Sequence, residues 1–288
     1  MKHLVIGATG LLGGYLLNEL NLRGNTAIGV GRRGPDFYVN LLAKGEVSKL
    51  IVDINPDVVW NAAAEVNLEK CEVNPRDAFL LNAAAVDEIA KQCESIRSRL
   101  VQISTDHFYA GGLAKKHCES DPVDLVNEYA RSKYEGEKFA LINKKSLVLR
   151  TNIVGFRNHP GMPTFADWLF SLIEEDGEGT LYSDMYTSTI DARTFCTVAC
   201  DLEERGASGV VNLASSEVSS KETFIKSVAE RLGKTLTRQS AGSVKAAWPR
   251  RADSLGLDVG LCEKILGYEL PNLEKVVENI VNEYRGLR

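Results

Sequence analysis

The chain has 288 residues, of which 44% are hydrophobic and 25% are charged, and its formal net charge is -5 at pH 7. This composition is typical of a globular protein, and the length suffices for one large α/β domain or for a main domain with a smaller partner. An acidic balance gives no electrostatic footprint for nucleic acid or for an anionic membrane, so both are excluded as partners.

The six cysteines are scattered, without a C-x-x-C pair or a histidine at the spacing of zinc ligands. This pattern predicts free thiols in a reducing compartment, with no disulfide framework and no metal site. No apolar run has the length of a membrane span, and the N-terminus lacks the apolar segment of a signal peptide. We therefore expect a cytoplasmic protein.

An apolar run at residues 2–6 breaks into glycines at Gly7, Gly10 and Gly13 and resumes as an amphipathic segment. This order predicts strand, tight turn and helix, in which the turn and the positive helix end hold the pyrophosphate of a dinucleotide. Gly7 permits turn dihedrals, Gly10 lets backbone N–H groups approach the phosphates, and Gly13 lets the helix pack closely on its strand. An ordinary tight turn is the less favoured interpretation, because the flanking strand and helix are both present. The predicted cofactor-binding residues here are Gly7, Thr9, Gly10, Leu11, Leu12 and Gly13.

A second buried strand is predicted at 26–31, and it ends on Arg32 and Arg33. In a βαβ nucleotide fold this position lies beside the adenosine ribose, where an acidic residue selects NAD and an arginine accommodates the 2′-phosphate of NADP. NADP(H) is therefore the expected cofactor, with NAD(H) as the alternative, and a solvated turn is the competing interpretation of the arginines. Asp36 and Asn40 follow in a stretch whose register the sequence leaves open, and either could reach the adenine.

The strand predicted at 57–61 runs into small residues that would let backbone border the cofactor, unless they begin a helix packed on the sheet. A long helix is expected from Pro75 to about Cys93, and it carries Asn82 in an otherwise apolar stripe. A buried asparagine needs hydrogen-bond partners, so we expect Asn82 to tie backbone across strands. The cofactor-binding candidates in this part of the chain are Ala62, Ala63, Ala64 and Asn82.

The strand at 100–106 brings Thr105 to the carboxyl edge of the sheet, where ligand chemistry gathers. A helix beginning near Asn127 then offers two Y-x-x-x-K pairs, Tyr129 with Lys133 and Tyr134 with Lys138. The pairs lie about 140° apart at 3.6 residues per turn, so only one can face the sheet.

We choose Tyr129 and Lys133, because Tyr129 lies at the helix start, next to the edge where Thr105 emerges. Tyr134 is flanked by Glu135 and Glu137 and is expected to be partly solvated.

Another buried strand is predicted at 145–150, and beyond Asn158 the alternation of strands and helices loosens. The expected fold is an α/β Rossmann domain, a doubly wound parallel sheet with helices on both faces, plus a smaller C-terminal substrate-binding lobe. We assign residues 1–155 to the dinucleotide-binding domain, with a later return strand near 209–213, and residues 156–288 mainly to the substrate-binding lobe.

Four motifs in this order resemble an extended short-chain dehydrogenase/reductase: the glycine triplet, Asn61 to Ala64, Ser104-Thr105-Asp106, and Tyr129-x-x-Ser132-Lys133. The resemblance covers essentially the whole chain. Segments 119–122, 149–151 and 249–258 are similar to the dTDP-4-dehydrorhamnose reductase branch, whose members reduce a 4-keto-6-deoxy sugar on a nucleotide carrier in dTDP-rhamnose biosynthesis. The resemblance implies a small-molecule nucleotide-sugar substrate, and it leaves a homodimer open.

The mechanism that the resemblance implies is hydride transfer from the nicotinamide to a ketone carbon. Lys133 would lower the phenol pKa by its charge and hold the nicotinamide ribose, Tyr129 would donate the proton, and Thr105 would hydrogen-bond the carbonyl oxygen. The implied catalytic residues are Thr105, Tyr129 and Lys133, the last two also binding cofactor, and the implied substrate-binding residues are Thr105, Asp106, His107, Asn152 and Arg251.

Two other functions compete with this one. A nucleotide-sugar dehydratase or epimerase is disfavoured, because the dehydratase branch needs an Asp-Glu pair after the threonine and here Asp106 is followed by His107. A non-catalytic dinucleotide-binding regulatory subunit is less favoured because Thr105, Tyr129 and Lys133 are all present.

Overall fold

The computed structural model describes residues 1–32, 36–157 and 162–287, which fold into two compact units. Unit 1 comprises Met1–Thr105, Asn127–Arg150 and Cys196–Val211, and unit 2 comprises Asp106–Val126, Thr151–Phe195 and Asn212–Arg288. The expected division at residue 155 differs from these units at residues 106–126 and 151–155, which lie in unit 2, and at residues 196–208, which lie in unit 1.

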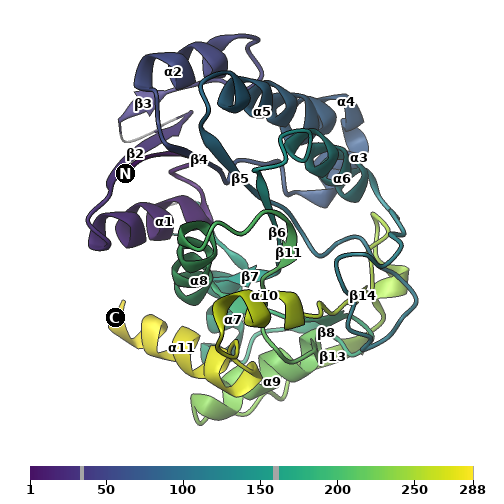
Figure 1. Ribbon diagram of the computed structural model, residues 1–288. Helices are drawn as coiled ribbons and strands as arrows, with labels where there is room; N and C mark the ends of the chain where they lie inside the picture. Colours follow the sequence, from purple (N-terminus) through teal and green to yellow (C-terminus); the bar gives the residue numbers. More distant parts are fainter. Residues whose placement is uncertain (33–35, 158–161, 288) are drawn as a thin grey trace. The chain divides into compact units, whose positions relative to one another are not determined.

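Unit 1 is built on a seven-stranded sheet with the order β11-β6-β5-β4-β1-β2-β3 (Figure 1). All pairings from β6 through β3 are parallel, and the strand order reverses next to β1, which is the switch point where doubly wound sheets bind ligands. The expected α/β Rossmann fold is thus confirmed, and the return strand is β11. The strands are β1 (Lys2–Ile6), β2 (Thr26–Gly31), β3 (Phe37–Tyr38), β4 (Val58–Asn61), β5 (Arg99–Ile103), β6 (Leu147–Arg150) and β11 (Gly209–Asn212).

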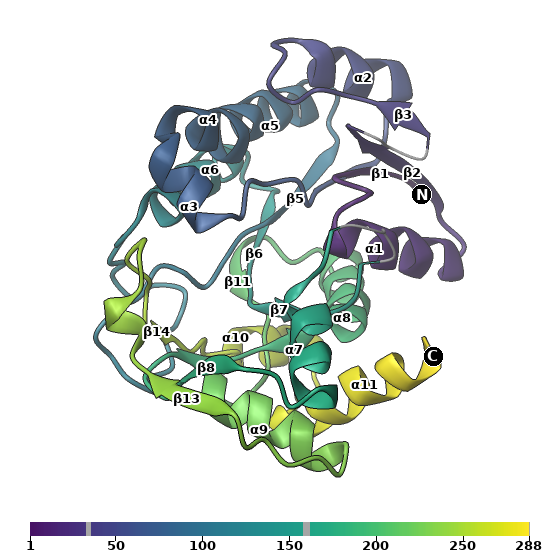
Figure 2. The same cartoon turned by 180° about the vertical axis from the view of Figure 1, so that it is seen from behind.

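Helices cover both faces of this sheet (Figures 1 and 2). One face carries α2 (Glu46–Ile54), α5 (Ala85–Ser95) and α6 (Glu128–Ala140), which enclose an apolar core with the sheet. The other face carries α1 (Leu11–Leu22) and the later part of α8 (Ala192–Glu204). Arg23, just after α1, donates to Asp201 on α8 at 2.8 Å.

The long helix expected from Pro75 is interrupted by one π-helical turn. It consists of α4 (Pro75–Phe79), η1 (Leu80–Ala84) and α5, and the short helix α3 (Leu68–Val73) precedes it. A π-turn inserts an extra residue into a helix and is frequent at functional sites.

Unit 2 combines short strands with helices around its own apolar core. Phe170 and Tyr284 stack in this core with ring centroids 4.0 Å apart. A capping box of Thr164 and Asp167 starts the first helix. The elements are β7 (Ile153–Val154), α7 (Phe165–Glu174), β8 (Gly179–Tyr182), β9 (Tyr186–Thr187), β10 (Ile190–Asp191), β12 (Ser219–Ser220), α9 (Lys221–Arg231), β13 (Gln239–Gly242), η2 (Val244–Ala246), β14 (Ser254–Leu255), α10 (Gly260–Leu266) and α11 (Leu273–Gly286).

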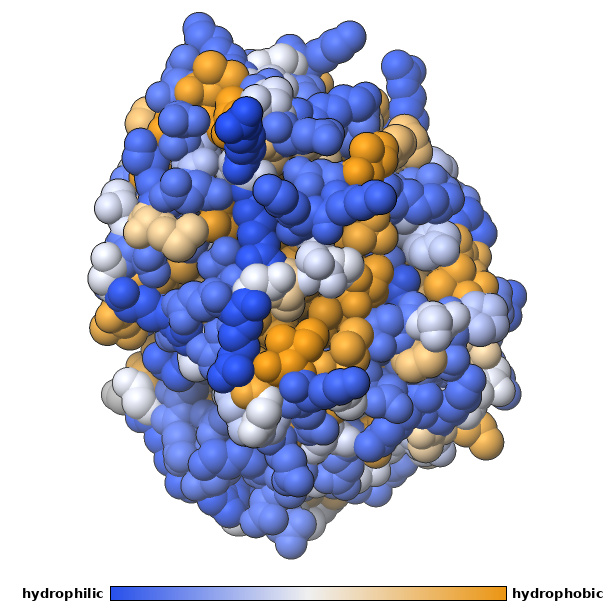
Figure 3. Space-filling view, in the orientation of Figure 1, coloured by the Kyte–Doolittle hydropathy of each residue, from blue (hydrophilic) through white to orange (hydrophobic). Residues whose placement is uncertain are grey.

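The surface is largely hydrophilic on the face shown in Figure 3, where hydrophobic residues form separate patches. None of the helices in the described ranges is long and apolar enough to cross a lipid bilayer.

Candidate active site

The glycine turn (Gly7, Gly10 and Gly13) connects β1 to α1 and leaves no room for a side chain at Gly7 or Gly13. Gly7 has a φ of +87°, and a Cβ there would lie 2.8 Å from the backbone nitrogen of Ala63. A Cβ on Gly13 would overlap the backbone of Gly7 and Ala8. Gly7 and Gly13 therefore have the turn conformation and the close helix–strand packing that the sequence predicts.

The first turn of α1 presents backbone donors to a ligand. The helix begins at Leu11, and its N-cap, Gly10, supplies no side-chain acceptor. The first N–H groups of a helix lack intrahelical partners, and with the helix dipole they bind anions. Thr9 is exposed there, and Leu11 and Leu12 are partly exposed. This turn fits the pyrophosphate of a dinucleotide, because residues 9–12 are at least partly exposed and the N-cap supplies no side-chain acceptor for the first N–H groups of α1.

The end of β2 carries the residues expected near the adenosine. Arg32 directly follows the strand with an exposed side chain, whereas Arg33 lies outside the described residues. Asp36 Oδ2 accepts a hydrogen bond from Gly29 N at 2.7 Å. Asn40 Oδ1 accepts one from Leu42 N at 3.1 Å. The Asp36 and Asn40 side chains thus bind local backbone, and Arg32 brings a positive charge to this strand end.

The residues from Ala62 to Asn67 form neither helix nor strand, and the next helix begins only at Leu68, so the helix start that was the alternative for Ala62, Ala63 and Ala64 is excluded. Asn82 in η1 is buried and holds this segment. Its Oδ1 accepts from Glu65 N at 2.8 Å, and its Nδ2 donates to Glu65 O and Ser132 Oγ, both at 3.0 Å. Asn82 ties backbone as expected, but it joins a loop to α6 rather than spanning strands.

Tyr129 and Lys133 occupy the buried face of α6, with 7% and 5% of their surfaces exposed. The helix starts where expected, because Asn127 Oδ1 caps it by accepting from Ala130 N at 2.8 Å. Lys133 Nζ donates to Ile103 O at 2.7 Å, at the end of β5 and two residues before Thr105. Burial lowers the pKa of Lys133 to about 8, against the opposing attraction of Glu137.

The alternative pair on the same helix faces solvent. Tyr134 is partly exposed and Lys138 is exposed. Lys138 Nζ pairs with Glu135 at 2.6 Å and lies 5.1 Å from the centroid of the Tyr134 ring. The geometry of α6 therefore favours Tyr129 and Lys133 as the inward pair.

Unit 2 contains the other predicted substrate-binding residues. Asp106 is 1% exposed and accepts from Asn152 Nδ2 at 2.8 Å. Asn152 Oδ1 in turn accepts from Thr189 Oγ1 at 2.9 Å. Burial, with smaller contributions from Lys221 and Arg251, lowers the pKa of His107 to about 4. His107 is therefore neutral at neutral pH, and its 4.0 Å contact with Asp106 is no ion pair.

Lys221, the first residue of α9, is a further candidate that sequence reasoning missed. Its Nζ lies 4.8 Å from the Phe165 ring centroid and 3.5 Å from both Asn152 Oδ1 and Thr189 Oγ1. Burial lowers its pKa, and the charge of Asp106 opposes this shift. Arg251 is partly exposed, and its Nε has no hydrogen-bond partner among the described residues. The sequence around Lys221 does not indicate its contacts, because the residues that surround its side chain come from segments distant in the sequence.

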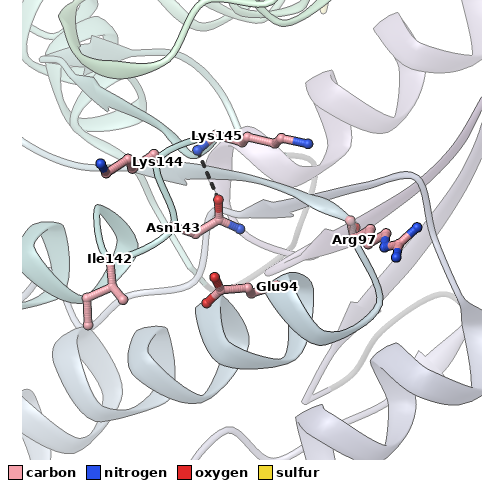
Figure 4. A pocket seen from close by; sticks show the side chains of 7 residues that line it. Glu94, Arg97, Ile142, Asn143, Lys144 and Lys145 are labelled. Carbon is pink, nitrogen blue, oxygen red and sulfur yellow. Dashed lines mark hydrogen bonds between the residues drawn. The ribbon is translucent and has the colours of Figure 1, made fainter.

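A cavity of about 410 Å³ lies elsewhere in unit 1 (Figure 4). Glu94 belongs to the last turn of α5, and the other lining residues lie in the connections from α5 to β5 and from α6 to β6. The cavity is therefore at the amino ends of these strands, opposite the edge that carries Thr105. It contains none of the predicted site residues. The lining consists of Glu94, Arg97, Ser98, Ile142, Asn143, Lys144 and Lys145.

Known proteins resemble the chain over its full length. The family model described as RmlD substrate binding domain matches residues 1–285. The probable low-salt glycan biosynthesis reductase of Haloferax volcanii is 28% identical, with 95% of both chains covered. The dTDP-4-dehydrorhamnose reductase of Shigella flexneri is 27% identical, with 98% of both covered.

Two further matches bear on the fold and on the alternatives. The crystal structure of dTDP-4-dehydrorhamnose reductase from Bacillus anthracis in complex with NADP has a TM-score of 0.86 at 20% identity, covering 98% of this chain and 99% of that one, so it supports the fold. Methionine adenosyltransferase 2 subunit beta of Xenopus tropicalis is 35% identical over 53% of this chain and 47% of its own.

The family match extends over nearly every residue of the sequence, from the glycine turn to the last helix. The chain therefore belongs to the RmlD substrate binding domain family and is related to the dTDP-4-dehydrorhamnose reductases, within the extended short-chain dehydrogenase/reductases.

Proposed function

We propose that the protein reduces a 4-keto-6-deoxy sugar attached to a nucleotide, with NADPH as the hydride donor. The observation that carries this proposal is the pairing of buried Tyr129 and Lys133 on one face of α6, with Lys133 Nζ 2.7 Å from the carbonyl oxygen of Ile103. This contact holds the lysine at the strand end that continues into Thr105. The full-length relatives that are reductases support the same chemistry.

Each of the three residue types suits one task in ketone reduction. NADPH, when bound with its pyrophosphate at the glycine turn, would supply the hydride for the keto carbon. Tyr129 donates its phenolic proton to the keto oxygen, so that the ketone becomes an alcohol. Lys133 as an ammonium ion lowers the pKa of the phenol and contacts the nicotinamide ribose, and Thr105 donates a hydrogen bond to the same keto oxygen.

NADP(H) is the preferred cofactor in this proposal, with NAD(H) as the second choice. Arg32 follows β2 at the position where a cation accommodates the 2′-phosphate. The structural relative from Bacillus anthracis binds NADP.

The protein is accordingly an NAD(P)-dependent oxidoreductase acting on a keto or CH–OH group. Six free cysteines support a cytoplasmic location.

The proposal is tested by incubating the purified protein with NADPH and a panel of 4-keto-6-deoxy nucleotide sugars while following the absorbance of the reduced nicotinamide. We expect Tyr129→Phe to abolish turnover and Tyr134→Phe, on the same helix, to preserve it. Equal loss in both variants, or full activity of Tyr129→Phe, contradicts the assignment.

A non-catalytic regulatory subunit is the second candidate, because one partial relative is the beta subunit of a methionine adenosyltransferase. It predicts NADPH binding without turnover of any keto sugar. Fluorescence titration with NADPH, run beside the activity assay, separates the two functions.

A further inference from the structure

Glu137 lies one helical turn beyond Lys133 on α6, and only 2% of its surface is exposed. Glu137 Oε1 accepts from Ser104 Oγ at 2.6 Å and from Arg150 Nε at 3.0 Å. Its Oε2 accepts from Arg150 Nη2 at 2.8 Å. Both carboxylate oxygens are therefore used inside unit 1.

The partners of Glu137 belong to the two strand ends beneath the catalytic helix. Ser104 lies between Ile103, whose carbonyl oxygen binds Lys133, and Thr105. Ser104 N also donates to Leu149 O at 2.8 Å, next to Arg150 at the end of β6. One carboxylate thus joins α6 to the ends of β5 and β6, and its partner Ser104 directly precedes Thr105.

We propose that Glu137 is a positioning residue of the active site: through Ser104 and Arg150 it fixes the end of β5 against α6 and keeps Lys133 in its charged, bound state. Its effect on turnover rests on the proposed reductase function, whereas its effect on Lys133 does not. A purely structural ion pair would hold the fold together but leave the titration of Lys133 unchanged.

The charge of Glu137 acts on Lys133 directly. Burial lowers the pKa of Lys133 to about 8, and the attraction of Glu137 limits this fall. Removing the carboxylate charge must therefore lower the pKa of Lys133 further. An opposite charge nearby typically changes a pKa by about one to three units, so we expect a fall of about one unit.

The remaining titratable groups near Lys133 come from α6 itself, β6 and α3. Tyr129 lies one turn before Lys133, and Arg150 from β6 faces Glu137. Cys71 from α3 packs against Tyr129, and burial raises the pKa of its thiol to about 11. Glu72, also on α3, accepts from Glu128 N at 3.0 Å at the start of α6. Glu137 is the charged neighbour that raises the pKa of Lys133.

The test compares Glu137→Gln with Glu135→Gln, a substitution on the exposed side of the same helix, where Glu135 pairs only with Lys138 among the described ion pairs. The first readout is the pKa of Lys133 in the cofactor-free protein, measured by NMR of ¹³C-labelled lysine side chains and assigned with Lys133→Arg. We expect Glu137→Gln to lower this pKa by about one unit, Glu135→Gln to leave it unchanged, and Glu137→Asp to restore most of it.

The second readout is the pH profile of kcat for keto-sugar reduction. In Glu137→Gln the alkaline limb of this profile should shift to lower pH by the same one unit. At pH values above both limbs, this shift corresponds to a tenfold loss of kcat relative to the wild-type protein. Ser104→Ala keeps the charge but removes one link to β5, so it should lower kcat severalfold without moving the limb.

An unchanged Lys133 pKa in folded Glu137→Gln overturns the inference even if the enzyme is a reductase. If the wild-type protein shows no turnover, the reductase function fails, and the NMR titration still decides on Glu137. If Glu137→Gln does not fold, Ser104→Ala carries the test: a kcat equal to that of the wild-type protein would overturn the inference.

Discussion

The carbonyl oxygen of Asn82 lies so close to Gly136 that a Cβ on residue 136 would overlap it. Asn82 belongs to the π-helical turn η1 and Gly136 to α6, so this approach fixes α6 against its neighbour. The Asn82 side chain adds hydrogen bonds to Glu65 and Ser132. The segment that borders the glycine turn and the helix that bears Lys133 are thereby held together inside unit 1.

Gly136→Ala should destabilise the protein, because the backbone of Asn82 cannot move away cheaply. We expect a loss of about 1–3 kcal/mol in the free energy of unfolding, the usual cost of overpacking. Denaturant unfolding of the variant measures it. Gly14→Ala is the matched control, because a Cβ at this helical position meets nothing within 4 Å. Alanine is also the better helix former there, so equal destabilisation by the two substitutions would contradict the argument.

Gly13→Ala should impair cofactor binding. Its Cβ would overlap Ala8 and Gly7, and the first turn of α1 would have to shift away from the phosphate position. We expect NADPH affinity to fall at least tenfold, or about 1.4 kcal/mol. Fluorescence titration gives the affinity, with Gly14→Ala as the neighbouring control. Unchanged NADPH binding by folded Gly13→Ala would show that the dinucleotide does not use this turn.

The local features of this site could be predicted from the sequence, and the long-range ones could not. The glycine turn depends on backbone conformation at Gly7 and on packing between adjacent elements, both of which leave a pattern in neighbouring residues. Helical periodicity indicates that only one of the two Y-x-x-x-K pairs faces the sheet, and the position of Tyr129 at the helix start favours its pair. The ion pair of Glu137 could not be predicted, because its partner Arg150 comes from a later strand. Lys221 was missed for the same reason, since Asn152 and Phe165 reach it from other segments.

Arg32→Ala should weaken NADPH binding more than NADH binding. The exposed guanidinium at the end of β2 is placed to bind the 2′-phosphate, a contact that NADH lacks. Hydrogen bonds to charged groups contribute about 1.5–3 kcal/mol, so NADPH affinity should fall by roughly tenfold or more. Titrations with both cofactors give the ratio. A ratio equal to that of the wild-type protein would leave Arg32 as a solvated turn residue.

Lys133 should make stability depend on pH in the alkaline range. Its pKa is lowered from 10.5 to about 8 by burial, so between these values the unfolded chain binds the proton and the folded protein does not. Stability contributed by this group therefore rises with pH from about 8 to 10.5, by up to about 3 kcal/mol, as the cost of burying the charge disappears.

The check is the unfolding free energy of wild type minus that of Lys133→Met, measured from pH 7 to 10.5. This difference should increase with pH, because other titrating groups contribute equally to both proteins. A flat difference would mean that Lys133 keeps an ordinary pKa.

Lys221→Gln should raise KM for the nucleotide sugar and leave kcat close to that of the wild type. The ammonium lies over the Phe165 ring, and its contacts with Asn152 and Thr189 are long, at 3.5 Å, so it keeps donor capacity for an oxygen of a substrate held at Asn152. Loss of a charged hydrogen bond costs about 1.5–3 kcal/mol, which corresponds to a rise in KM of roughly tenfold or more.

Lys226→Gln is the control, because Lys226 is exposed on the same helix and pairs with Glu222 at 2.6 Å. In steady-state kinetics, Lys221→Gln should have a higher KM than Lys226→Gln, and the two variants should have similar kcat values. A similar KM in the two would remove Lys221 from the substrate site, whereas a loss confined to kcat would assign it to the chemical step instead.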